Sequence, residues 1–246
     1  MLTLEFARLG GINWRLALPF ACALEMIHTY SLIHDDLPAM DDDKLRRGQP
    51  TNHLVYGENM AILAGDGLLN LAYETMLSAP LCEKEPAHAL RAAREIACRA
   101  GVRGMIAGQT LDVKLEGSEP NRDNVRYIHL HKTADLLTAP VVAGLMLAGA
   151  NEEQLEAGRQ YGRGIGLAFQ IVDDILDIVS TTEELGKDAG SDIEKGKATY
   201  PSIVGLEKSR ERAHELYEES LKALEGLEGD TSILRSIAAF IITRVK

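Results

Sequence analysis

The sequence predicts an all-α protein, a single-domain antiparallel helical bundle that spans residues 1–246. First, 46% of the 246 residues are hydrophobic and 26% are charged, which is the balance of a globular protein with one substantial core. Second, aromatic residues make up 5% of the chain, whereas Ala, Leu and Glu, which favour helices, are plentiful. Third, apolar residues recur every three or four positions, and no convincing run alternates as a strand would.

The first helix is predicted from Phe20, Ala23 and Ile27, which step by three and four and form one apolar stripe. Similar stripes predict further helices over 59–78, 88–107, 123–149, 153–179, 208–224 and 232–244. Glycine and proline favour turns at 47–50, 78–80, 116–120, 186–190 and 226–230. Asp123 and Thr231 stand where helix N-caps are expected.

Composition argues against several classes of protein. The net charge of −11 leaves no broad basic surface, so no nucleic-acid partner is expected. An odd number of cysteines, Cys22, Cys82 and Cys98, argues against a disulfide framework. The longest uncharged run, Leu136–Asn151, is too short to span a bilayer, and no export signal with a cleavage site follows Arg15. We therefore expect a cytoplasmic protein without a membrane-spanning segment.

An acidic cluster at the end of the first predicted helix is the most informative segment. Residues 34–43 include aspartates at 35, 36, 41, 42 and 43. A run of like charges is usually a solvated surface, but this one directly follows an apolar helix. Pro38 disfavours helical geometry at the residue before it, so we expect the helix to break there. The break would let Asp35 and Asp41 point into one site.

A second cluster, residues 170–177, keeps helical spacing without a proline. Asp173 and Asp177 lie four residues apart on one face, and Gln170 precedes Asp173 by three. Carboxylates on a largely apolar helix repel one another and are costly to bury unless a cation compensates. Oxygen ligands without His or Cys favour a hard ion, so we predict Mg²⁺, shared with a diphosphate held between the two clusters.

Basic residues accompany both acidic clusters. They are Arg46, Arg47, Lys132, Lys187, Lys195 and Lys197. Each alone is more often a surface side chain, because charged groups are mostly exposed. In a chain with 37 acidic and 26 basic residues, their placement beside the aspartates indicates an anion site.

Taken together, these residues resemble a known family, the trans-type isoprenyl diphosphate synthases, or polyprenyl synthetases, and among them the bacterial farnesyl diphosphate synthases. The resemblance runs from about Leu16 to the C-terminus. It rests on Asp35-Asp-x-x-x-x-Asp41, Arg46-Arg47, Leu63-Ala-Gly-Asp-Gly67, Gly108-Gln109, Lys132-Thr133, Gln170-x-x-Asp-Asp-x-x-Asp177, Lys187 and Lys197-Ala-Thr-Tyr200. It implies the isoprenoid synthase fold, a helical bundle around a central cavity, and a homodimer.

The resemblance also implies a role for individual residues. Three Mg²⁺ ions would be held by Asp35, Asp41 and Asp173, with Asp36, Asp177 and Asp192 close behind. The allylic diphosphate would be contacted by Arg46, Lys132, Lys187 and Lys197. Isopentenyl diphosphate would be bound by His28 and Arg47. Read without the family, His28 shares a helical stripe with Asp35, and a histidine with no ligand is the alternative.

The implied reaction is a Mg²⁺-dependent condensation of dimethylallyl or geranyl diphosphate with isopentenyl diphosphate to give farnesyl diphosphate. Lys132, Thr133 and Gln170 would form the catalytic set, with the Thr133 and Gln170 oxygens near the allylic cation. In this family, residues just before the first aspartate cluster form the floor of the chain cavity. Ser31 is small, so Tyr30 is the expected floor, with Leu69 as an alternative, and an aromatic floor favours a C15 product.

The chain departs from the family at its N-terminal end. The family carries a Gly-Gly-Lys-x-Arg-x-x-Pro segment, whereas Gly10-Gly11 is followed here by Ile12-Asn13-Trp14. We therefore expect residues 1–15 to be atypical and the first one or two helices of the family to be missing. The departure leaves a rival hypothesis, a non-catalytic or truncated subunit that binds an allylic diphosphate or a partner subunit. The intact second cluster, by contrast, argues against a class I terpene cyclase.

Overall fold

The computed structural model describes residues 1–119, 121–180 and 197–244, and within them the prediction of an all-α protein is confirmed. The α-helices are α1 (Leu2–Leu9), α2 (Trp14–Asp35), α3 (Asn52–Tyr56), α4 (Glu58–Leu77), α5 (Pro80–Lys84), α6 (Pro86–Ala100), α7 (Met105–Lys114), α8 (Arg122–Ile128), α9 (Asp135–Leu147), α10 (Glu152–Val179), α13 (Tyr200–Val204), α14 (Leu206–Ala223) and α15 (Ser232–Thr243). A π-helix, η1 (His129–Ala134), joins α8 to α9, and a 3₁₀ turn, η2 (Leu224–Gly226), follows α14. The two short strands β1 (Leu45–Arg46) and β2 (Gln49–Pro50) form an antiparallel hairpin.

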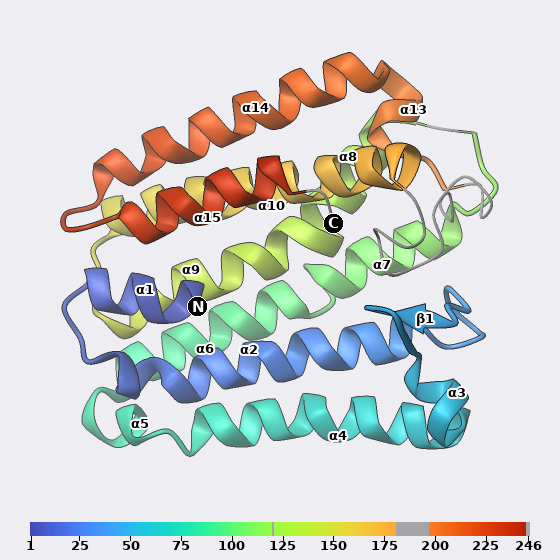
Figure 1. Cartoon of the computed structure of the whole chain (residues 1–246). Coiled ribbons are helices and arrows are strands. Elements are labelled where there is room, and N and C mark those ends of the chain that lie inside the picture. The colour runs from blue at the N-terminus through green and yellow to red at the C-terminus, as the bar shows by residue number, and fades with distance from the viewer. Residues whose placement is uncertain (120, 181–196, 245–246) are drawn as a thin grey trace.

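The long helices pack side by side in layers (Figure 1). Helix α2 lies along α4, and α9 packs against α6 and α10. Helices α14 and α15 pack against another side of α10. Helix α1 packs on α9, and its Phe6 is fully buried in the hydrophobic core. The C-terminal end of α2 lies beside the β1–β2 hairpin, at the same end of the bundle as α7 and α8 (Figure 1). That end carries Asp35, Asp41 and Lys132 of the predicted site.

Two sequence predictions about helix boundaries were wrong. The predicted helix 88–107 is divided into α6 and α7 by the segment 101–104, where Gly104 approaches the Arg99 carbonyl so closely that a Cβ would overlap it. The N-cap of α8 is Asn121, whose side chain accepts from the backbone N–H of Asp123, so Asp123 lies inside the first turn. The prediction of Thr231 as the N-cap of α15 is confirmed.

Close approach of helices positions the π-helix η1. A Cβ on Gly108 of α7 would overlap the backbone of Lys132, and a Cβ on Gly166 of α10 would overlap Ala134. Glycine therefore lets both α7 and α10 lie directly against η1. This packing explains why a glycine precedes Gln109, while Gly162 and Gly164 of α10 allow a similar approach to Thr138 of α9 and Ser220 of α14. It also brings Lys132 and Thr133 next to the aspartate-bearing helices.

Among the helices that the structure describes, α2 alone is long and apolar enough to cross a membrane by length and composition. A core helix of a bundle meets the same criterion. Helix α2 buries Phe20, Ile27 and Tyr30, and it packs against α1, α4 and α9.

Candidate active site

The first acidic cluster forms where α2 ends. Asp35 is the last residue of α2, and the chain then turns over Pro38, so that the Asp41 backbone N–H donates to the Asp35 carbonyl at 2.9 Å. Asp42 adopts a left-handed conformation with φ of 50° and closes the turn with a hydrogen bond to the Leu37 carbonyl. The predicted break at the proline is thus confirmed, and it brings Asp35 and Asp41 into one site.

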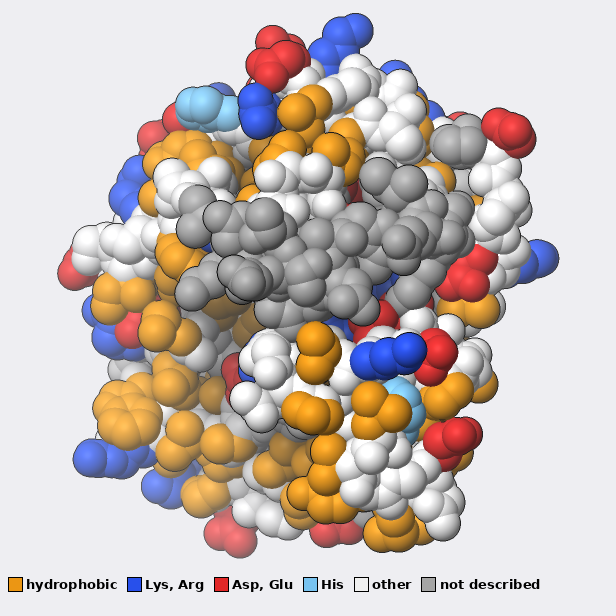
Figure 2. Space-filling model, turned by 45° about the vertical axis from the view of Figure 1, so that its right-hand side comes forward, with side chains coloured by type: hydrophobic (Ala, Val, Ile, Leu, Met, Phe, Trp, Pro, Cys, Tyr) orange, Lys and Arg blue, Asp and Glu red, His pale blue; other side chains and the backbone are white. Residues whose placement is uncertain are grey.

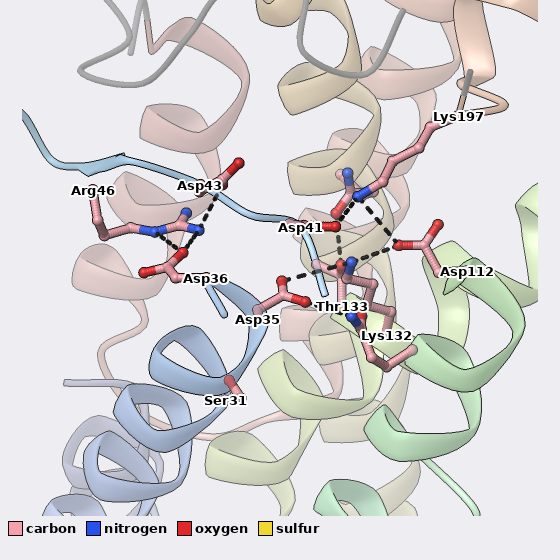
Figure 3. Close-up of polar contacts among 12 residues, drawn as sticks. Ser31, Asp35, Asp36, Asp41, Asp43, Arg46, Asp112, Lys132, Thr133 and Lys197 are labelled. Atoms are coloured by element: carbon pink, nitrogen blue, oxygen red, sulfur yellow. Dashed lines mark hydrogen bonds and ion pairs between the residues drawn. The ribbon is translucent and has the colours of Figure 1, made fainter. Parts of the chain in front are cut away.

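Two lysines from other segments lie among these aspartates (Figure 3). The Lys132 Nζ of η1 donates to Asp112 Oδ2 of α7 at 2.6 Å and lies 3.8 Å from Asp35 Oδ2. The Lys197 Nζ donates to Asp41 Oδ1 at 2.7 Å and lies 3.8 Å from Asp112 Oδ2. Asp112 therefore lies between both ammonium groups. Among the described residues, these three carboxylates and two ammonium groups form one network of ion pairs.

Burial shifts the pKa values of groups in this network. Burial raises the pKa of Asp35, and the Lys132 ammonium only partly offsets the effect. For Lys132, burial opposes the charged form, but attraction to Asp35, Asp112 and Asp41 outweighs it and raises the pKa of the amine. The site therefore favours positive charge strongly, since even a buried amine stays protonated.

The second cluster faces the π-helix from α10. The Thr133 hydroxyl donates to Gln170 Oε1 at 2.6 Å, so the two predicted catalytic oxygens lie together. Asp173 is partly exposed, with the Arg244 Nη2 at 3.4 Å from its carboxylate, and Asp177 is buried one turn further along α10. In the described part of the chain, no three His, Cys or acidic side chains converge closely enough to hold a metal ion. The predicted ligands are thus near one another but not assembled.

Arg46 and Asp36 lie beside this site and are paired with each other. Arg46 contacts Asp36 through both Nε and Nη2, and its Nη2 lies 3.2 Å from Asp43 Oδ2. Asp36 is 3% exposed, and in Figure 3 this group is separate from the Lys132 and Lys197 cluster. The structure therefore places Asp36 behind Asp35, in contact with a cation of its own. Arg46 is directed at Asp36 and Asp43.

The residues predicted to bind isopentenyl diphosphate lie on the same side of the bundle. Arg47 is exposed at the tip of the β1–β2 hairpin, with a positive φ of 54°. Burial lowers the pKa of His28 on α2, Glu25 opposes this change, and Arg47 and Arg46 add to it. His28 and Arg47 are thus within electrostatic reach of each other. Lys187 and Asp192 lie outside the described residues.

The two residues predicted to set chain length lie one turn below Asp35. The Ser31 hydroxyl donates to the His28 carbonyl at 2.9 Å (Figure 3). Tyr30 is buried, and its ring lies edge-on to His34 with centroids 5.8 Å apart. Burial raises the pKa of Tyr30, and Tyr73 of α4 raises it further. The Tyr30 ring is therefore a bulky group between α2 and α4 below the aspartates.

Four residues near the site were given no role in the sequence analysis. Gln109 donates to Asp35 Oδ1, and Asp112 pairs with both lysines. Asp174 accepts from Gln170, and Arg244 pairs with Asp173. The motif Gly108-Gln109 could have pointed to Asp112, because residues three apart share a helix face. Nothing in the sequence pointed to Arg244, because it is distant from Asp173 along the chain and only the fold brings the two residues together.

The chain is similar to known proteins over most of its length. Residues 1–232 match the polyprenyl synthetase family, and the chain belongs to that family. It is therefore a prenyltransferase of the isoprenoid synthase fold, as the motifs predicted.

Three relatives show how far the similarity extends. A heterodimeric geranylgeranyl pyrophosphate synthase large subunit from Arabidopsis thaliana is 47% identical over 99% of this chain and 67% of its own length. A geranyltransferase from Helicobacter pylori, solved with magnesium and isoprenyl diphosphate, superposes with a TM-score of 0.84 and 31% identity, over 98% of this chain and 82% of the other. An FPP/GFPP synthase from Zymomonas mobilis superposes with a TM-score of 0.86 and 34% identity, over 98% of this chain and 81% of the other.

The charge balance of the cluster predicts the effect of removing one lysine. Lys132→Met should lower the melting temperature in EDTA by about 2–10 °C, because loss of about 1–3 kcal/mol is expected when a partly buried carboxylate loses its cation. Added Mg²⁺ should reduce this loss, since it supplies the missing charge. Lys208→Met, at an exposed position on α14, is the control and should change the melting temperature little in either buffer. An equal loss with and without Mg²⁺ would contradict the charge-balance account.

Proposed function

We propose that this prenyltransferase condenses an allylic diphosphate, dimethylallyl or geranyl, with isopentenyl diphosphate and releases farnesyl diphosphate. The observation that carries the proposal is the convergence of two aspartate-bearing segments with two lysines and a Thr–Gln pair. Asp35 and Asp41 end α2, Asp173 lies on α10, and the bond between Thr133 and Gln170 joins η1 to α10. Such a site can hold a diphosphate at one end and a developing cation beside it.

The donor set fits Mg²⁺. The aspartates offer oxygen atoms alone, which suits a hard divalent ion that shares its shell with phosphate oxygens. The carboxylates of the first cluster attract cations, as their ion pairs with Lys132 and Lys197 indicate, and a solved relative is described with magnesium and isoprenyl diphosphate. We propose that Asp35, Asp41 and Asp173 hold three Mg²⁺ ions, with Asp36 and Asp177 behind them. Mg²⁺, when bound, would neutralise the negative charge of the departing diphosphate.

The reaction then follows from the placement of the chain's own groups. Lys132 and Lys197, with Arg46 beside them, hold the allylic diphosphate, and we propose the same role for Lys187, which lies outside the described residues. The C1–O bond of the substrate breaks, and the bonding electron pair stays on the diphosphate. The Thr133 and Gln170 oxygens face the allylic cation. His28 and Arg47 hold isopentenyl diphosphate, whose double bond supplies the electron pair of the new C–C bond. The resulting cation loses a proton to the released diphosphate, which restores a double bond.

The bulk below the first cluster supports a C15 product. Tyr30 is a buried aromatic residue five positions before Asp35, with its ring beside His34, and we propose it as the floor that a growing chain meets. Ser31 leaves space above it. The relatives themselves carry different product names, a geranylgeranyl synthase and an FPP/GFPP synthase among them.

A homodimer in the cytoplasm is part of the proposal. Large apolar side chains are exposed along α3 and α4: Leu54, Val55, Tyr56, Met60, Ile62 and Leu63. Figure 2 shows hydrophobic side chains gathered on the lower part of one face, at the level of α3 and α4 in Figure 1. An apolar patch of this kind is typical of a subunit interface. One relative is named as a subunit of a heterodimer, which supports pairing through a surface of this fold.

The direct test is to incubate the purified chain with Mg²⁺, geranyl diphosphate and isopentenyl diphosphate, and to separate the products by chromatography. We expect a C15 diphosphate, and we expect Asp35→Asn to reduce its formation by a factor of about 10² or more, because a charge that holds the departing group is lost. Absence of product, with Mg²⁺-dependent binding of geranyl diphosphate retained, would contradict the proposal. That result would favour the rival function of a subunit that binds without condensing, which the unmatched sequence after Gly10-Gly11 suggests.

The chain-length proposal has its own test. Tyr30→Ala should shift the product from C15 toward C20 or longer, because the floor of the cavity is removed. Phe240→Ala, which removes an exposed aromatic side chain of α15, is the control and should leave product length unchanged. If Tyr30→Ala still gives C15 alone, another residue, such as Leu69, forms the floor.

A further inference from the structure

The side-chain amide of Gln170 lies between two partners of different chemistry. The Thr133 hydroxyl donates to its Oε1 at 2.6 Å, and its Nε2 donates to Asp174 Oδ1 at 2.9 Å. Asp174 is the middle aspartate of the second cluster and is 3% exposed. Hydrogen bonds thus run in series from Thr133 through Gln170 to Asp174.

The carboxylate of Asp174 determines the direction of these bonds. An ionised carboxylate has acceptors alone, so the Gln170 group that faces it must be the NH₂. The amide oxygen then faces Thr133, and the Thr133 hydroxyl must donate its hydrogen to that oxygen. The Thr133 lone pairs and the second lone pair of Gln170 Oε1 are left outside this bond, and both are available to a cation.

Asp174 is itself held in place from two other segments. The backbone N–H of Tyr200, at the start of α13, donates to Asp174 Oδ2 at 2.7 Å. The buried ring of His129, in the first position of η1, has its Nε2 at 3.2 Å from the same oxygen. Both carboxylate oxygens of Asp174 therefore contact groups of the protein. Its environment differs from that of Asp173, which is partly exposed at the site.

We propose that Asp174 is a positioning residue that fixes the polarity of the Thr133–Gln170 pair, so that oxygen lone pairs rather than hydrogens face the allylic cation. This inference rests on the proposed prenyl transfer. Its physical basis is that oriented dipoles stabilise a developing charge without having to reorganise during the reaction. His129 and Tyr200 support the orientation by holding Asp174 itself.

An amide at position 174 would reverse the polarity. In Asp174→Asn, the Oδ1 can still accept from the Tyr200 N–H, so the start of α13 keeps its bond. The Nδ2 of the new asparagine then faces Gln170 and can only donate a hydrogen. The Gln170 amide must therefore turn its oxygen toward residue 174, and its NH₂ then faces Thr133. Thr133 must accept, and its hydrogen turns toward the cation. We expect kcat with geranyl diphosphate to fall by about 10²-fold, the usual effect of losing one oriented group in such a site. KM for geranyl diphosphate should change by less than about threefold.

A second substitution should restore the polarity. In the double variant Gln170→Glu with Asp174→Asn, a carboxylate at 170 accepts both from Thr133 and from the Asn amide, and the total charge is unchanged. We expect kcat of the double variant to be at least about tenfold higher than kcat of Asp174→Asn. Gln170→Glu alone, by contrast, adds an uncompensated charge. A residue with a merely structural role would show no such rescue.

A readout that needs no turnover separates this inference from the proposed function. The probe is an ammonium analogue of the allylic cation, with an uncharged hydrocarbon of the same shape as its control, each titrated calorimetrically with Mg²⁺ and inorganic diphosphate. Asp174→Asn should weaken binding of the ammonium by about tenfold or more and leave the hydrocarbon unaffected. Equal affinity of wild type and Asp174→Asn for the ammonium would overturn the inference, as would kcat losses of equal size in Asp174→Asn and in the double variant. A wild type that binds the ammonium but makes no C15 product would overturn the proposed function instead.

Discussion

The rest of the site depends on one network of buried and partly buried ion pairs. Asp35, Asp41 and Asp112 come from α2, the turn that follows it, and α7, and they share the ammonium groups of Lys132 and Lys197. Each ion pair joins segments that are distant in sequence, so the cluster ties the end of α2 to α7, η1 and the start of the last helical layer. Carboxylates that already hold two ammonium groups attract cations, and a diphosphate-binding magnesium site requires such an attraction.

Close helix packing makes this arrangement possible. Gly108 and Gly166 allow α7 and α10 to lie directly against η1, where side chains of ordinary size would hold them apart. The π-helix widens the turn at the place where Lys132 and Thr133 are needed, and such turns occur frequently at functional sites. Lys132 can then face the first aspartate cluster, while its neighbour Thr133 faces Gln170 of the second cluster.

Much of this could be predicted from local patterns. Helical spacing predicted the long helices, Pro38 predicted the break after α2, and the motifs predicted the residues that meet there. Features that arise from tertiary contacts could not be predicted. The predicted helix 88–107 is divided where Gly104 closely approaches the Arg99 carbonyl, and the role of Asp112 depends on lysines 20 or more residues away in the chain. The pairing of Arg46 with Asp36 likewise follows from how the chain returns in the hairpin.

The most direct test of this account is a crystal structure of the chain with Mg²⁺ and a non-hydrolysable analogue of geranyl diphosphate. The account predicts metal ions bound by Asp35 and Asp41 on one side and by Asp173 on the other, with the diphosphate between them. It also predicts that Lys132 and Lys197 leave their carboxylate partners and contact diphosphate oxygens. A diphosphate bound elsewhere, or lysines still paired with Asp112 and Asp41 while the ligand is in place, would contradict it.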